Sequence, residues 1–197
     1  MIKRLSALAV VLLISLTASA QVARFSAGVK GTGVANLMDV NFLTYGGGGG
    51  VFAGVRIANV VGLQAEAIYA MTYGTSSYRL SGAVRLADVK HNYLYVPVVA
   101  QIWCGRSVAL EAGYQQAIVM SGTIGNTEFE KDDEGMFDYG SVIAGINFNL
   151  GKVVTMNLRY SYSLDYSYVK TTVPFKAHGV QLGLGFRFFT TRKQIFR

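Results

Sequence analysis

The sequence is poor in the residues that cross-link, interrupt or solvate a chain. Its 197 residues include one cysteine, two prolines and two histidines, and only 15% are charged. The single cysteine, Cys104, excludes a disulfide framework within the chain. Soluble domains average about 25% charged residues. The shortage of charge therefore indicates that much of this surface does not face water.

Long apolar runs are also missing, apart from one at the N-terminus. Two basic residues precede the apolar residues 5–16, and a small-x-small cleavage pattern ends at Ala20. This run is too short to span a bilayer comfortably, and no cysteine follows it to carry a lipid. The pattern predicts a signal peptide over residues 1–20 and an exported mature chain that begins near Gln21.

Glycine and aromatic residues are plentiful, with 23 Gly, 12 Tyr and 11 Phe. They belong to eight segments in which apolar residues occupy every second position, the period of a strand with two different faces. The cleanest example places Leu63, Ala65 and Ala67 opposite Gln64 and Glu66. The eight predicted strands are 23–33, 48–58, 61–74, 90–103, 107–120, 138–150, 153–165 and 178–189.

The connections between these strands alternate between short and long. Short turns are predicted at 58–60, 104–106 and 151–152, and long loops at 34–47, 75–89, 121–137 and 166–177. This rhythm is typical of outer-membrane barrels, with short periplasmic turns and long extracellular loops. The predicted fold is an all-β, eight-stranded antiparallel up-and-down transmembrane barrel over 21–189. Residues 190–197 would form a short basic tail or a strand extension.

A soluble barrel of the lipocalin kind would alternate in the same way, with its apolar face inward. The polar face distinguishes the two, because here it holds mostly Gly, Ser, Thr, Asn and Gln rather than the Lys and Glu of a wetted surface. Small residues suit the crowded interior of eight strands. Aromatic residues also occur near both ends of the apolar face, as in interfacial girdles. The apolar face is therefore predicted to meet the lipid of a bacterial outer membrane.

Six charged residues on the polar face are predicted to point into the lumen. A buried charge is costly unless it is paired and hydrogen-bonded, so Glu66 and Glu111 should lie among the arginine side chains. A structural network that plugs the barrel is the favoured interpretation. A proton or ion path would need an aqueous lumen, which eight strands rarely leave. The six residues are Lys30, Arg56, Glu66, Glu111, Arg159 and Arg187.

Catalytic and cofactor motifs are scarce. The two histidines are His91 and His178, and Asp88 with His91 and Ser81 or Ser121 could be drawn as a triad. Neither spacing nor motif supports that triad. The sequence has no metal-ligand spacing and no phosphate-binding loop. We therefore predict a protein that is not an enzyme and holds no cofactor.

One predicted loop concentrates much of the acidic charge. It is interpreted as a solvated loop, with contact to a divalent cation or a partner as the alternative. The net charge of +7 does not argue for nucleic acid, because the chain is exported and several cations point into the lumen. The acidic residues are Glu128, Glu130, Asp132, Asp133 and Glu134.

Six short motifs, in their order and spacing, resemble the PorT-type outer-membrane β-barrel family of Bacteroidetes. The resemblance covers essentially the whole mature chain. It implies an outer-membrane barrel, and it raises an accessory role in secretion, because the family's named member is similar to proteins required for the type IX system. The motifs are Gly28-Val29-Lys30-Gly31, residues 64–69, residues 93–98, Phe137-Asp138-Tyr139-Gly140, residues 158–164 and residues 181–188.

The family pattern also carries a proline at the position of Pro97, inside a predicted strand. Proline donates no ladder hydrogen bond and normally marks an edge or a bulge. A local bulge is therefore predicted at Pro97.

These observations predict a non-enzymatic, monomeric barrel with a plugged polar lumen and extracellular loops for partner contact or envelope integrity. An accessory role in secretion or envelope assembly is the alternative, and a lipid-modifying enzyme is a more distant one. The expected partners are outer-membrane lipid, the barrel-assembly machinery during biogenesis, and secretion or envelope proteins.

Overall fold

The computed structural model describes residues 22–38, 42–80, 83–124, 127–130, 138–165 and 177–194. In this part of the chain no helix is long and apolar enough to cross a membrane. The predicted signal peptide lies outside the described residues. The strands are β1 Val22–Met38, β2 Phe42–Ile57, β3 Val61–Leu80, β4 Ala83–Cys104, β5 Val108–Ile124, β6 Thr127–Glu130, β7 Tyr139–Leu150, β8 Val154–Asp165 and β9 Ala177–Gln194.

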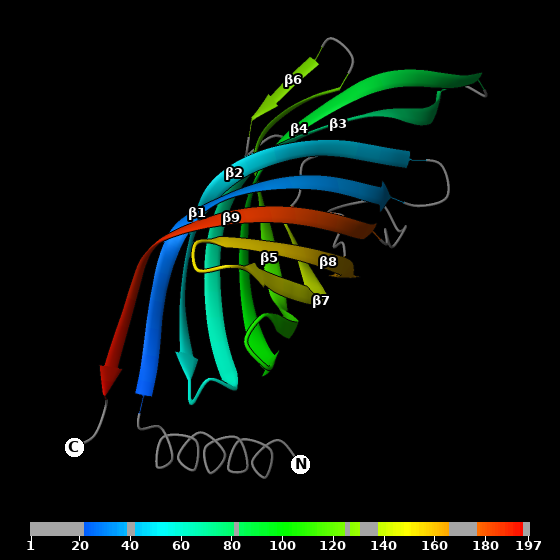
Figure 1. Ribbon diagram of the computed structural model, residues 1–197. Helices are drawn as coiled ribbons and strands as arrows, with labels where there is room; N and C mark the ends of the chain where they lie inside the picture. The colour runs from blue at the N-terminus through cyan, green and yellow to red at the C-terminus, as the bar shows by residue number, and fades with distance from the viewer. Residues whose placement is uncertain are drawn as a thin grey trace, which may run out of the picture.

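Eight of these strands close into one antiparallel barrel (Figure 1). Going round the wall, the order is β4, β3, β2, β1, β9, β8, β7 and β5, and pairing between β5 and β4 completes the ring. The short β6 pairs with the end of β5 and lies outside the ring. The predicted eight-stranded up-and-down barrel is confirmed.

The two faces of the wall differ as the alternation predicts. Large apolar side chains such as Leu63, Ile102 and Leu182 are exposed on the outside, each by about half or more of its surface. Their neighbours Gln101 and Gln181 point inward and are buried. The barrel therefore has an apolar exterior and a closely packed interior.

The three short turns lie at one end of the barrel together with both ends of the described chain (Figure 1). We call this the turn end, and the opposite one the loop end. Two of the turns contain glycines with positive φ, Gly105 at 85° and Gly151 at 89°. Side chains disfavour that conformation, so glycine suits these positions. The third turn instead uses Ala58 and Asn59 at φ 49° and 60°.

Most residues of two predicted loops are strand instead. β1 and β2 stay paired as far as Met38 and Phe42, and β3 and β4 as far as Leu80 and Ala83. A membrane-spanning strand needs only about 9–11 residues, whereas β4 has 22. Outside a bilayer both faces of a strand meet water, so the apolar alternation ends while the hydrogen-bond ladder continues. The β3–β4 hairpin accordingly runs on past the ends of its neighbours in Figure 1.

The bulge predicted at Pro97 is wrong. The β4–β5 register is unbroken through the pair Pro97 and Gln115. The irregularity lies nearer the loop end of β4, between Asn92 and Tyr93. Opposite β3 the ladder pauses at Pro97 and then resumes in the same register. Pro97 points inward and is fully buried, and the ladder opposite β3 loses the positions of Val96 and Pro97 without an extra residue being inserted.

A bulge does occur near the end of β9. Arg187 pairs with Gly28 and Phe189 pairs with Ala27, which leaves Phe188 as the extra residue. Phe188 and Phe189 consequently both face outward, 72% and 52% exposed. The strand then continues through Gln194, and residues 195–197 lie outside the described part.

Candidate functional site

Four charged residues from four strands meet in the middle of the lumen. Lys30 Nζ lies 2.8 Å from Glu66 Oε2, Arg159 Nη2 lies 2.6 Å from Glu66 Oε1, and Arg159 Nε lies 2.7 Å from Glu111 Oε2. We call these four residues the central cluster. β3 and β8, which carry Glu66 and Arg159, stand four strands apart in either direction round the ring. The cluster therefore ties opposite walls together.

Small residues leave space for these long side chains. Glu111 on β5, Gly145 on β7 and Arg159 on β8 form one row of register partners. A Cβ at Gly145 would come within 2.9 Å of Arg159 Cγ. On β9, next to the strand that carries Lys30, a Cβ at Gly183 would collide with Lys30 Cε. Glycine at both positions lets the arginine and the lysine extend to their carboxylates.

The central cluster is almost completely removed from water. Its residues are between 1% and 7% exposed, and its two cations balance its two carboxylates. Two amides complete the network, because Gln64 Nε2 donates to Glu66 at 2.7 Å and Gln101 Nε2 donates to Glu111 at 2.8 Å. One donor, Arg159 Nη1, has no partner among the described residues. Such matching is what buried charges require.

Toward the loop end the lumen also holds a group of apolar and aromatic side chains, beside buried polar ones such as Asn36, Thr44 and Thr72. Tyr93 stacks on Tyr95 at 5.5 Å between ring centroids and meets Tyr139 edge-on at 5.7 Å. Between these rings and the central cluster, Gln181 Nε2 donates to Gln115 Oε1 across the lumen. We call the apolar group the loop-end plug; it comprises Val34, Ile68, Ala70, Tyr93, Tyr95, Ala117, Val119 and Tyr139.

The other two predicted network residues lie elsewhere, at the turn end. Arg56 donates from Nε and Nη2 to the carbonyl of Asn59 and from Nη2 to the carbonyl of Gly105. Its guanidinium lies 3.9 Å from the centre of the Trp103 ring. Arg187 donates from Nη2 to Asn149 Oδ1 at 3.0 Å. Neither arginine is among the ion pairs of the central cluster.

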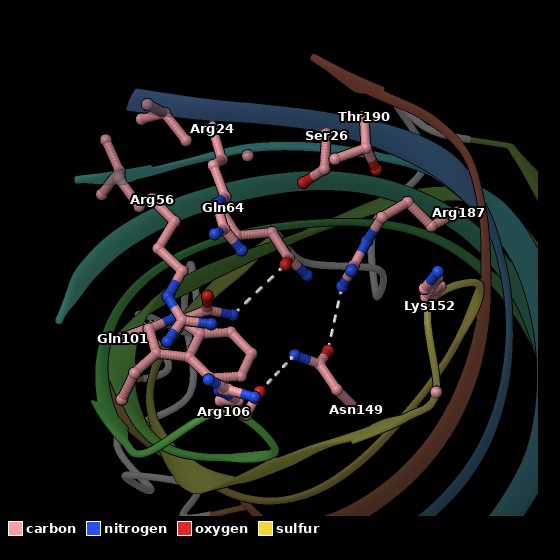
Figure 2. A pocket seen from close by; sticks show the side chains of 15 residues that line it. Arg24, Ser26, Arg56, Gln64, Gln101, Arg106, Asn149, Lys152, Arg187 and Thr190 are labelled. Atoms are coloured by element: carbon pink, nitrogen blue, oxygen red, sulfur yellow. Dashed lines mark hydrogen bonds between the residues drawn. The ribbon is translucent and has the colours of Figure 1, made fainter. Parts of the chain in front are cut away.

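Arg56 and Arg187 instead line a cavity of about 350 Å³ at the turn end, which we call the turn-end cavity. Figure 2 shows side chains from several strands and turns converging on it. Among the described residues that line it there is no aspartate or glutamate. The sequence analysis did not predict this cavity. The feature that could have indicated it is the recurrence of basic residues near the short turns. Its five cationic residues are Arg24, Arg56, Arg106, Lys152 and Arg187.

The acidic segment is only partly described. Glu128 and Glu130 belong to β6, where they are register partners of Thr123 and Ser121. Asp132, Asp133 and Glu134 lie outside the described residues. The described part of the chain holds no group of three His, Cys, Asp or Glu side chains placed to bind a metal ion. Contact of this segment with a cation or a partner stays a prediction.

The histidines are engaged by aromatic neighbours rather than by a nucleophile. Ser121 accepts a hydrogen bond from Asn92 Nδ2 at 2.7 Å. His91 Nδ1 has no partner among the described residues, and its ring meets Tyr93 edge-on. His178 forms a hydrogen bond with the Tyr160 hydroxyl. This arrangement does not assemble the triad that could be drawn with Ser121, and Ser81 lies outside the described residues.

Comparison with known families agrees with this geometry. Residues 6–188 match the model described as the outer membrane protein beta-barrel domain. The chain belongs to this family. It is therefore a protein of the bacterial outer membrane, and its turn end faces the periplasm, because the short turns of such barrels are periplasmic.

A solved structure shows the same fold at low sequence identity. The barrel is similar to neisserial surface protein A, with a TM-score of 0.51 and 13% identity over 83% of this chain and 97% of that one. It also matches OprG of Pseudomonas aeruginosa, with a TM-score of 0.43 and 12% identity over 86% and 96% of the two chains. A search of curated proteins finds no match.

Proposed function

We propose that this barrel is a non-enzymatic, monomeric and non-conducting protein that closes its own lumen and presents extended extracellular strands for partner contact or envelope integrity. The observation that carries the proposal is the filling of the lumen in successive layers. The central cluster, the Gln115–Gln181 bridge and the loop-end plug follow one another along the axis. An ion would have to displace each of these layers to pass.

The extracellular end supports the second half of the proposal. β3 and β4 have 20 and 22 residues, about twice what a bilayer requires. A paired hairpin that projects beyond the lipid offers a stiffer surface than an unpaired loop. β6 adds a further short strand beside the end of β5. We propose that this surface, together with the acidic segment that follows β6, meets the extracellular partner.

Conductance in planar lipid bilayers tests the closed lumen. The wild-type barrel should give no steady conductance steps under an applied voltage. A triple variant, with Tyr93, Tyr95 and Arg159 each replaced by glycine, removes the plug and the cross-lumen ion pairs. If it folds, as judged by its mobility on an unheated gel, it should conduct. Tyr69→Gly, on the lipid face, is the matched silent control. Steady steps from the wild type would contradict the proposal.

An accessory role in secretion or envelope assembly is a second candidate, and it rests on the resemblance to PorT-type barrels of Bacteroidetes. The β1–β9 pair favours it, because pairing continues past Phe188 and Phe189 as far as Val22 and Gln194. This extension of the paired strands lies on the periplasmic side, where secretion components would contact it. Deletion of the gene should then reduce export of secreted cargo. Unchanged export would contradict this candidate.

A further inference from the structure

We propose that the turn-end cavity binds a phosphate-bearing ligand from the periplasmic side. This inference goes beyond the closed-barrel function and does not depend on it. Five cationic side chains line the cavity, and the described residues around it include no acid. Like charges gathered around one cavity repel one another, and a bound anion relieves that repulsion. The proposed ligand supplies that anion.

Unused hydrogen-bond donors are the second, independent observation. Trp103 is 8% exposed, and its Nε1 has no partner among the described residues. The Nε atoms of Arg24 and Arg187 are also buried without a partner. All three side chains line the turn-end cavity. Buried donors are ordinarily satisfied by protein or by an occupant of the site, so these three favour an occupant that accepts hydrogen bonds.

Two of the five cations, Arg56 and Arg187, are also held in place by contacts within the protein. Two backbone carbonyls and the Trp103 ring hold Arg56. Asn149 links Arg187 to the turn, because it accepts from Arg187 and donates to the Arg106 carbonyl, as Figure 2 shows. Preorganised guanidinium groups favour oxyanions, which they can bind through two parallel N–H donors.

The rest of the chain offers no obvious internal counter-charge. Glu66 and Glu111 are already paired within the central cluster. Every other aspartate and glutamate of the sequence belongs to the loop-end parts of the strands or to the connections there. No aspartate or glutamate side chain of the barrel wall is therefore placed to neutralise the turn-end cavity.

The cavity volume of about 350 Å³ falls in the range of small-molecule sites. Several cations around one cavity suit a multiply charged phosphoryl group better than a single carboxylate. Two sources share this chemistry: a soluble phosphate compound of the periplasm and the headgroup of an inner-leaflet phospholipid. The experiment below separates them.

Trp103 is the only tryptophan of the chain, so its fluorescence reports directly on the turn-end cavity. The full-length mature barrel in uncharged detergent micelles should show a saturable change in Trp103 emission when pyrophosphate is added at constant ionic strength. Sodium chloride at matched ionic strength should give none. Calorimetric titration provides a second reading that does not depend on fluorescence.

The double variant Arg24→Gln with Arg187→Gln should bind pyrophosphate at least about tenfold more weakly, because two charged donors are lost. Lys90→Gln, at an exposed position toward the loop end, is the control and should bind like the wild type. In the lipid arm, micelles doped with phosphatidylglycerol replace pyrophosphate.

Saturation by pyrophosphate supports a soluble source. Saturation by phosphatidylglycerol alone supports the headgroup as the source, provided that the double variant weakens it. The proposal is overturned if neither probe saturates, or if the double variant binds as tightly as the wild type. Retained barrel mobility on an unheated gel shows that the double variant is folded.

Discussion

The cations inside the barrel occupy two different electrostatic environments. In the central cluster, Lys30 and Arg159 are balanced by two carboxylates at hydrogen-bonding distance. In the turn-end cavity, five cations share one space with no acid among the described residues that line it. The two regions are separated by little more than the amides of Gln64 and Gln101, which border both. Access to water, rather than distance, distinguishes them.

The degree of burial of each group explains why one is charge-balanced and the other is not. Two unit charges at about 4 Å interact by about 1 kcal/mol in water and about 4 kcal/mol at an effective dielectric constant of about 20. Unmatched cations are therefore tolerable where solvent or a dissolved anion reaches them, and costly where they are sealed off. A balanced group serves stability, whereas an unbalanced group at an open end is suited to binding.

Breaking the balanced region should have the largest effect. Arg159→Leu leaves Glu66 without its cross-lumen partner and Glu111 without its ion pair, and removing one side of a buried pair costs about 3–5 kcal/mol. We expect a loss of this size in the free energy of unfolding. Urea titration of the barrel in lipid vesicles, followed by Trp103 fluorescence, measures it.

Arg187→Leu is the matched control, because it removes the same side chain from the turn-end cavity. Within the described part of the chain its side chain bonds to Asn149, so we expect a change below about 1 kcal/mol. Equal losses from the two substitutions would show that the central charges are not packed against each other.

Charge balance can be tested apart from contact number. Glu66→Gln leaves Lys30 and Arg159 facing Glu111 alone, a net positive charge in a sealed space. Adding Lys30→Met removes a further side chain but restores one cation to one carboxylate. The double variant should therefore be more stable than Glu66→Gln by about 1–2 kcal/mol, a coupling expected of contacting groups. Additive losses in urea titrations would refute the importance of balance.

Sequence reasoning reached the faces of the wall because a period of two assigns each residue to one side. It placed Lys30, Glu66, Glu111 and Arg159 inside for that reason. Which of them meet depends on strand register and on the stagger of the closed ring, and alternation carries no information about either. Arg56 was consequently grouped with the glutamates, although it lies at the turn end against Trp103.

Two further features could not be predicted from the sequence, and the reasons are physical. The loop-end plug includes Ile68, which follows outward-facing Ala67, so two neighbouring apolar residues face opposite sides and blur the pattern. The strands continue beyond the bilayer because backbone pairing needs no apolar face. Met38 and Phe42 are therefore still paired where the alternation had already ended.

The smallest expected effect concerns the turn-end cavity, the solvent-accessible one of the two charged regions. Arg24→Gln removes one of five like charges from the turn-end cavity, so at low salt and without phosphate it should stabilise the barrel by about 0.5 kcal/mol. Because salt screens exposed charges and leaves buried ones nearly unaffected, this gain should vanish at about 1 M sodium chloride. The cost of Arg159→Leu should persist there. Urea titrations at the two salt concentrations measure both, and a gain from Arg24→Gln that survives high salt would mean that repulsion in the turn-end cavity is not its cause.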